Sequence, residues 1–329
     1  MKVLSIIIPS YNTSSFMDRS LRTFIDNRLN GRVELLIVND GSKDDTSKKA
    51  HGYETKHPDL IRVIDKENGG HGSVINRGAQ EAKGKYIKVV DGDDWVETDN
   101  LVKLVDALEA CESDVVLNPY YTVDVSNNDK KKFIDLPVKK SEYKFEDISD
   151  KIAQFQIHTM TIKTDILRKV RLTENCFYED FQYDLFPVPY VETVRVLNFP
   201  VYDYLIGQKS QSVSDQSVLK NHLMEQKILF DSIKYYSEVK NSLNNEKKKF
   251  FIKNICTLSR QAYNIYLRNY KAPDSYREFK KFDQRYKKAS PYFYRETSEA
   301  NKYIEFTRKG GIFAFNLTGK MLKAYKSIK

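Results

Sequence analysis

Residues 86–95 read Tyr86-Ile-Lys-Val-Val-Asp-Gly-Asp-Asp-Trp95, an apolar run that ends in an acidic turn containing glycine. The run has the length and the β-branched content of a buried strand. Three similar runs precede it, at Val3 to Ile8, Val33 to Val38 and Ile61 to Ile64. Segments of helical length separate these runs, and a βαβαβ series of this kind predicts an α/β fold with a mostly parallel, Rossmann-like sheet.

Polar, small residues follow three of the four predicted strands. The three loops are Pro9-Ser-Tyr-Asn12, Asn39-Asp-Gly-Ser42 and Asp91-Gly-Asp-Asp94. Ligands of open parallel sheets lie at the carboxyl ends of the strands, so we expect the three loops to hold one nucleotide together. The sequence contains neither a Gly-x-Gly-x-x-Gly fingerprint nor a Walker lysine motif, which excludes those two modes of phosphate binding.

Asp91 and Asp93 are candidate metal ligands. They are two positions apart, so their side chains share a face if the strand geometry continues. Two carboxylates suit Mg²⁺ or Mn²⁺, which fills its other positions with water and phosphate oxygens. Such an ion would neutralise a departing diphosphate. The alternative interpretation of the segment is a solvated acidic turn.

Four motifs, in this order and at this spacing, resemble those of family 2 of inverting glycosyltransferases, which have the GT-A fold. The motifs are Ser5-Ile-Ile-Ile-Pro-Ser-Tyr-Asn12, Val38-Asn-Asp-Gly-Ser-Lys-Asp-Asp-Thr46, Asn68-Gly-Gly-His-Gly-Ser-Val-Ile-Asn-Arg-Gly78 and Val89-Val-Asp-Gly-Asp-Asp94. The resemblance covers residues 1–120 strongly and 155–215 more loosely. It implies an enzyme that uses a nucleotide sugar.

The resemblance also implies a set of residues around a UDP-sugar: Pro9, Tyr11, Asn12, Asp40, Asn68, Gly69, Gly70, Asp91 and Gly92. In this set Asp40 would accept the uracil N3–H, and Asp91 would contact either the ribose or the metal. Asp93 would ligate the metal, Mn²⁺ or Mg²⁺, together with Asp91.

An inverting transfer needs a base that deprotonates the acceptor hydroxyl. The family supplies it from a Glu-Asp pair eighty or ninety residues beyond the metal motif, and Phe177-Tyr-Glu-Asp-Phe181 fits that distance. The resemblance therefore implies that Asp180 is the base and that Glu179 lies near the acceptor. Asp184, one helical turn further on, is a competing carboxylate.

Four more side chains are candidate contacts of the acceptor or the diphosphate: His71, His158, Gln208 and Lys209. His71 stands where the family often has a small residue or Arg, and Gln208 replaces the family's usual Arg, so that Lys209 would supply the charge. A lone histidine beside a strand, such as His158, is also explained by a structural role.

The charge divides the chain into two parts. Residues 221–329 contain 24 Lys and Arg against 10 Asp and Glu, a net charge of +14, whereas residues 1–220 carry 30 against 35, or −5. We expect a catalytic domain at 1–217, with a nucleotide-sugar half at about 1–120 and an acceptor half at 121–217. Residues 218–329 would form a basic α-helical region that binds an anionic membrane surface, packs on the catalytic domain or pairs two subunits; no recognised nucleic-acid module accompanies the charge.

The sequence lacks an apolar run long enough for a signal peptide or a membrane span, which predicts a cytoplasmic protein. The basic C-terminal segment leaves open the alternative that the protein is peripheral at the inner face of the plasma membrane. The leading hypothesis is metal-dependent transfer of a hexose from a UDP-sugar to a hydroxyl of a polysaccharide, a lipid-linked glycan or a glycoprotein glycan. The alternative hypothesis is a nucleotide-binding protein without turnover, in which the basic region binds a partner.

Overall fold

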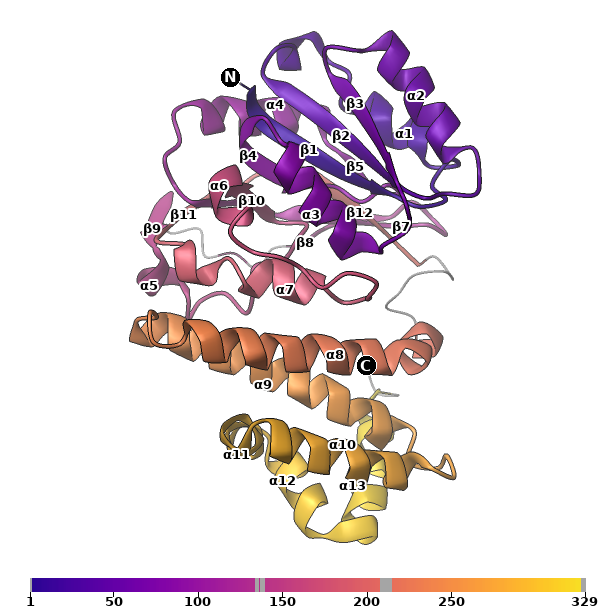
Figure 1. Cartoon of the computed structure of the whole chain (residues 1–329), viewed down its shortest axis with the longest axis vertical. Coiled ribbons are helices and arrows are strands. Elements are labelled where there is room, and N and C mark those ends of the chain that lie inside the picture. Colours follow the sequence, from indigo (N-terminus) through magenta and orange to yellow (C-terminus); the bar gives the residue numbers. More distant parts are fainter. Residues whose placement is uncertain (1, 134–135, 137–139, 208–214, 327–329) are drawn as a thin grey trace. The chain divides into compact units, whose positions relative to one another are not determined.

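The computed structural model describes residues 2–133, 136, 140–207 and 215–326, and Figure 1 shows the order of its elements. The chain divides into two compact units, residues 1–211 and 212–329. The first unit combines strands and helices, and the described part of the second is helical. The domain boundary expected after residue 217 stays a prediction.

A sheet of eight strands forms the centre of the first unit, in the order β3-β2-β1-β4-β10-β6-β11-β9. The strands are β1 (Lys2–Ser10), β2 (Val33–Asp40), β3 (Ile61–Lys66), β4 (Gly84–Val89), β6 (Val115–Leu117), β9 (Glu142–Lys144), β10 (Met160–Lys163) and β11 (Thr193–Val196). The first four run parallel to one another, whereas β10 is antiparallel to both of its neighbours. The predicted α/β class with a mostly parallel sheet is confirmed.

Helices cover both faces of this sheet. The longer ones are α1 (Met17–Arg22), α2 (Thr46–Lys56), α3 (His71–Glu81) and α4 (Thr98–Glu109). Ile6 and Ile8 of β1 belong to a buried cluster that includes Leu104 of α4. The intervening Ile7 faces α3, where a Cβ on Gly78 would come within 2.7 Å of it. Because β1 is covered on both faces, it reads as a continuous apolar run rather than as an alternating one.

A second sheet of four strands, in the order β5-β12-β7-β8, lies in the same unit. Its strands are β5 (Trp95–Val96), β12 (Tyr202–Ile206), β7 (Tyr120–Asp124) and β8 (Lys130–Phe133). The pairing of β12 with β5 sets Tyr202 opposite Val96, directly beyond the acidic turn. The sequence did not predict that these strands form a sheet of their own, and β5, with two residues, is too short to carry a periodic signal.

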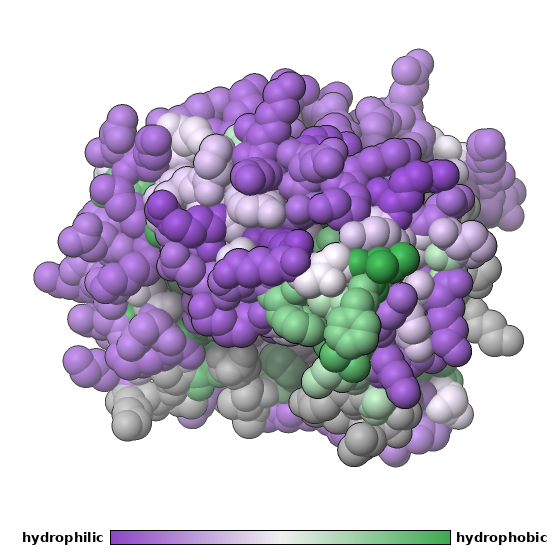
Figure 2. All heavy atoms as spheres, turned by 90° about the horizontal axis from the view of Figure 1, so that it is seen from below, coloured by the Kyte–Doolittle hydropathy of each residue, from purple (hydrophilic) through white to green (hydrophobic). Residues whose placement is uncertain are grey.

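The second unit contains helices α8 (Asp215–Val239), α9 (Asn245–Arg268), α10 (Ser275–Ala289), α11 (Pro291–Ala300), α12 (Lys302–Lys309) and α13 (Gly311–Lys326). Aromatic side chains dominate its core, among them the buried Tyr263, Phe282 and Tyr286. Within residues 2–326, as far as they are described, no helix is both long and apolar enough to cross a bilayer. Figure 2 shows an apolar patch on one face that is otherwise largely hydrophilic.

A buried ion pair ties α12 to α10. Arg308 Nε donates to Asp283 Oδ1 at 3.0 Å, and the guanidinium lies 3.7 Å from the ring centroid of Tyr294. Both charged side chains are less than a tenth exposed, at 5% and 8%. Removing one partner of such a pair leaves a buried charge uncompensated.

We therefore expect Arg308→Met to lower the free energy of unfolding by about 3–5 kcal/mol. Urea denaturation followed by circular dichroism measures this change. The control is Arg295→Met, because the Arg295 side chain is 65% exposed and its loss should cost under about 0.5 kcal/mol. Equal stabilities of the two variants would refute a structural role for the buried pair.

Candidate active site

The loops after β1, β2 and β4 meet at the carboxyl edge of the sheet, as the sequence predicts. Asn12 N–H donates to Ser42 Oγ at 2.9 Å, and Lys43 N–H donates to Asn12 Oδ1 at 2.8 Å, so the first two loops are bonded reciprocally. The third loop approaches the first closely, since a Cβ on Gly92 would lie 2.6 Å from the Pro9 carbonyl oxygen. Glycine is required there by this contact.

Asp40 anchors the loop of residues 68–70. Its carboxylate accepts from Gly69 N–H at 2.9 Å, from Gly70 N–H at 2.8 Å and from Lys66 Nζ at 2.6 Å. Asn68 Nδ2 donates to the Asp40 carbonyl oxygen at 2.9 Å. The structure thus gives the buried Asp40 a role that the sequence did not predict, while its contact with uracil stays a prediction.

Tyr11 lies on the loop after β1, and its side chain is 48% exposed. An exposed aromatic ring at this edge is available to stack on a flat ligand. The neighbouring Asn12 has a φ of +54°, a conformation that asparagine adopts more readily than most residues. Asparagine is therefore well suited to the backbone conformation of this turn.

The carboxylates of the acidic turn differ in burial and in hydrogen bonding. Asp94 is buried and accepts from the Tyr202 hydroxyl at 2.6 Å and from Leu205 N–H at 2.8 Å. Burial, followed by the negative charge of Asp91, raises the pKa of Asp94 well above its usual range. Asp93 is only partly buried, and its carbonyl oxygen accepts from Arg19 Nη2 at 3.2 Å.

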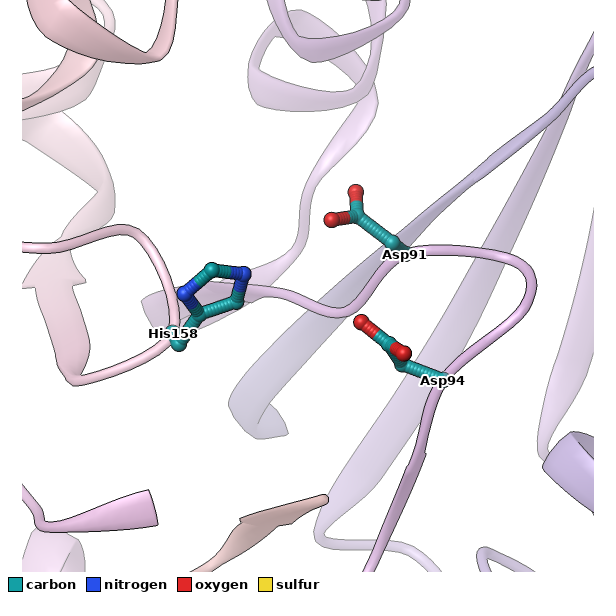
Figure 3. Close-up of side chains that lie close together, drawn as sticks. All are labelled: Asp91, Asp94 and His158. Atoms are coloured by element: carbon teal, nitrogen blue, oxygen red, sulfur yellow. The ribbon is translucent and has the colours of Figure 1, made fainter. Parts of the chain in front are cut away.

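Asp91, Asp94 and His158 form a group that is able to hold a metal ion. Their ligand atoms lie within 4.8 Å of one another, and in the part of the chain that the structure describes no other group of His, Cys, Asp or Glu brings three ligand atoms this close together. Figure 3 shows the two carboxylates at the ends of the turn and His158 reaching in from a separate loop. The group does not include Asp93, whose predicted role as a ligand stays a prediction.

The surroundings of His158 keep its ring neutral and fixed. Burial lowers the pKa of His158 to about 4, and the neutral imidazole is the form that binds metals. The ring stacks on Tyr204 with 4.2 Å between centroids. Lys88 of β4, which is fully buried, donates from Nζ to the His158 carbonyl oxygen at 3.0 Å, and burial lowers the pKa of Lys88 to about 7. A lysine within an apolar strand was the sequence signal for this contact, which we did not predict.

His71 bridges the acidic turn and the Glu179-Asp180 pair. Its Nε2 lies 2.9 Å from Asp91 Oδ1, and its Nδ1 lies 2.5 Å from Glu179 Oε1. Burial opposes the charged form, but the hydrogen bonds to the two carboxylates outweigh it and raise the pKa of His71 well above its usual range. The two carboxylates on either side of His71 therefore favour its charged form.

The predicted base pair begins helix α7 (Asp180–Leu185). Tyr178, just before it, has a φ of +71°, a strained conformation for an aromatic residue. Glu179 is buried, with no hydrogen-bond partner for Oε2 among the described residues, whereas Asp180 is exposed. Part of the Asp180 side chain is exposed, but the surrounding protein removes some of the hydration of its carboxylate, and this loss, then repulsion from Glu179, raises the pKa of Asp180 to about 6.

Asp184 does not share the exposure of Asp180. It is buried, and its Oδ2 accepts from Gln154 Nε2 at 3.2 Å. Burial, followed by the charge of Asp180, raises the pKa of Asp184 well above its usual range. Of the two carboxylates, Asp180 is the one that solvent or an acceptor is able to reach. Gln208 and Lys209, the remaining predicted contacts, lie outside the described residues.

A mostly parallel sheet with acidic and glycine-containing loops at its carboxyl edge defines an α/β protein of the GT-A type, and solved structures agree. Staphylococcus aureus TarS residues 1–349 superpose with a TM-score of 0.65 over 100% of this chain and 92% of that one, at 17% identity. The structure of TarS 1–349 in complex with UDP-GlcNAc gives a TM-score of 0.52 over 81% of this chain and 83% of that chain, at 18% identity. These similarities establish the GT-A fold.

The sequence profile of the family described as Glycosyl transferase family 2 matches residues 5–171, and the chain belongs to this family. Among curated proteins, it is 35% identical over 119 residues to the Bacillus subtilis "Uncharacterized glycosyltransferase EpsJ", covering 36% of this chain and 34% of that protein. It is 28% identical over 178 residues to the B. subtilis "Minor teichoic acid biosynthesis protein GgaB", covering 52% of this chain and 19% of that protein. The chain thus spans about a third or less of the length of these two relatives.

Proposed function

We propose that the chain is an inverting glycosyltransferase that moves a hexose from a UDP-sugar to a hydroxyl of a glycan. The observation that carries this proposal is the bridge of His71 between Asp91 and Glu179. It joins the nucleotide edge of the sheet to the candidate base in one continuous site. A protein that only binds nucleotide has no need of a carboxylate pair at that position.

The donor is proposed to lie across the three loops at the sheet edge. Tyr11 would stack on the uracil, and the loop anchored by Asp40 would cover the nucleoside. The structure of TarS with UDP-GlcNAc supports a UDP-sugar as donor for this fold. Which hexose is bound depends on contacts with individual hydroxyl groups.

The candidate metal ligands fit a divalent ion. Asp91 would hold it together with His158 and Asp94, or with Asp93 as the spacing of the motif predicts. Carboxylate oxygens are the ligands that Mg²⁺ and Mn²⁺ prefer, and a neutral imidazole favours Mn²⁺ of the two. When bound, the ion would neutralise charge on the departing diphosphate.

Asp180 is proposed to act as the general base. Its carboxylate takes the proton of the acceptor hydroxyl, the acceptor oxygen bonds to the anomeric carbon, and the bond from that carbon to the UDP oxygen breaks. Attack comes from the face opposite the leaving group, so the configuration inverts. Glu179, next to this base, is proposed to lie near the acceptor.

The pH profile tests the role of Asp180. A base acts only when deprotonated, and the pKa of Asp180 is raised to about 6. We therefore expect kcat/KM to be constant above about pH 7 and to fall tenfold per unit below about pH 6. Initial rates across this range, at a fixed free Mn²⁺ concentration, measure the profile. A kcat/KM that does not change between about pH 5 and pH 7 would exclude Asp180 as the base.

The acceptor is proposed to be a cell-surface polysaccharide, a lipid-linked glycan or a glycoprotein glycan, and the relation to a teichoic acid biosynthesis protein supports the first. The direct experiment is a screen of UDP-sugars for hydrolysis and transfer, with and without EDTA. One UDP-hexose should be consumed faster than the others, and EDTA should stop its consumption. If UDP binds but no sugar is turned over, the chain is a nucleotide-binding protein without turnover.

A further inference from the structure

Helix α13 exposes an apolar stripe. Phe313, Leu317 and Met321 follow one another at intervals of four residues, so they lie on one face of the helix. Their exposed fractions are 73%, 39% and 64%, whereas Ala314 and Phe315 on the other side are buried. The helix therefore has a buried apolar face and a second, exposed one. Figure 2 shows apolar side chains gathered in one patch of an otherwise hydrophilic surface.

The exposed stripe lies in a segment without acidic residues. Residues 306–329 contain no Asp or Glu and six basic residues. Two of these, Lys320 and Lys323, are exposed on α13 itself, beside the stripe. Apolar side chains flanked by lysines, with no compensating carboxylate, are the pattern of a helix that lies in the plane of a membrane interface.

A bilayer with anionic lipids fits this surface better than a second copy of the chain. A twofold interface would bring the same face of both copies together and so set two lysine-bearing helices against each other, with no carboxylate on α13 to offset the repulsion. An anionic bilayer provides hydrocarbon for Phe313 and Met321 and negative headgroups for the lysines. The net charge of +14 on residues 221–329 attracts the whole unit to such a surface.

We propose that α13 docks the chain on an anionic membrane surface, with Phe313, Leu317 and Met321 inserted at the level of the headgroups. This docking does not depend on the proposed transferase activity, so either proposal is able to fail alone. If both hold, the enzyme works at the surface where a lipid-linked acceptor is found.

Cosedimentation of the full chain with vesicles tests the proposal. One set of vesicles contains phosphatidylcholine alone, and the other contains about 30% phosphatidylglycerol. We expect binding to the second set that weakens with salt, and little to the first. Replacing Phe313, Leu317 and Met321 together by Ser should weaken binding more than tenfold. Each of Lys320→Gln and Lys323→Gln should weaken it about fivefold.

The matched control is Leu223→Ser on α8, since Leu223 is also an exposed apolar residue, at 63%. It should leave vesicle binding unchanged. All variants change exposed side chains, so thermal unfolding should show that they remain folded. Absence of binding to either set of vesicles, or equal binding by the triple variant, would overturn the proposal. A dimer in sedimentation velocity that the triple variant loses would instead assign the stripe to a second copy.

Discussion

Asp180→Asn is expected to lower the rate of sugar transfer by about 10²- to 10⁴-fold while the binding of UDP stays unchanged. The amide has nearly the shape of the carboxylate but is unable to take the proton of the acceptor hydroxyl. Because Asp180 is exposed and starts α7, the substitution should not disturb the fold. Initial rates give the loss of activity, and isothermal titration gives the dissociation constant of UDP.

Two further variants make this experiment specific. Asp165→Asn replaces a carboxylate that is 90% exposed, and we expect it to keep full activity. Asp184→Asn replaces the competing carboxylate, which is buried against Gln154 and away from an acceptor, so the loss of activity should be small. If Asp184→Asn abolished transfer and Asp180→Asn did not, the base would be Asp184.

Asp91→Asn is expected to remove the metal-dependent part of UDP binding and to lower activity by about 10²- to 10³-fold. Asp91 is common to the predicted ligand pair and to the group with His158, and it also accepts from His71. With Mn²⁺ present, UDP should raise the melting temperature of the unmodified chain but not that of the variant. An equal rise in both would remove Asp91 from the metal site.

Two companion variants decide the second ligand. His158→Gln removes the imidazole of the group seen in the structure, and Asp93→Asn removes the carboxylate that the motif spacing predicts. The variant that weakens Mn²⁺-dependent UDP binding more identifies the ligand. Asp94 is less suited to this comparison, because its substitution also breaks the bonds to Tyr202 and Leu205.

The sequence predicted the parts of the fold whose signals are local. Strands β1, β2 and β4 are largely buried, so each appears as an apolar run followed by polar loop residues, whereas β3 at the sheet edge is only partly buried. The series of strands and helices predicted that the sheet is mostly parallel, but not the order of its strands. The convergence of Asn12, Asp40 and Asp91 at one edge was predicted on the same ground, since they follow neighbouring parallel strands.

The contacts that organise the site could not be predicted in this way. His71, Asp91 and Glu179 meet because α3 and the loop before α7 pack closely at Gly72, where a Cβ would lie 2.4 Å from the Thr173 carbonyl oxygen. No spacing of residues records such an approach. The anchoring of the loop at Gly69 and Gly70 by Asp40 is likewise a consequence of tertiary packing.

In the helical unit, too, part of the structure was not predicted from the sequence. The sequence predicted a basic α-helical region at residues 218–329 without one of its breaks, which lies where the structure ends α10 at Ala289 and begins a new helix at Pro291. The signal was present, because Ser290 caps that helix and Pro291 occupies its first position. The helical spacing of apolar residues continues across this break, so the spacing alone did not indicate it.

The most direct test of the account is NMR of a transfer reaction with the UDP-hexose that the screen selects, Mn²⁺ and a glycan acceptor. We predict that an α-linked donor is consumed and that the new glycosidic bond is β, with transfer lost in Asp180→Asn. A product with retained configuration, or no consumption of any UDP-sugar by a chain that binds UDP, would contradict it.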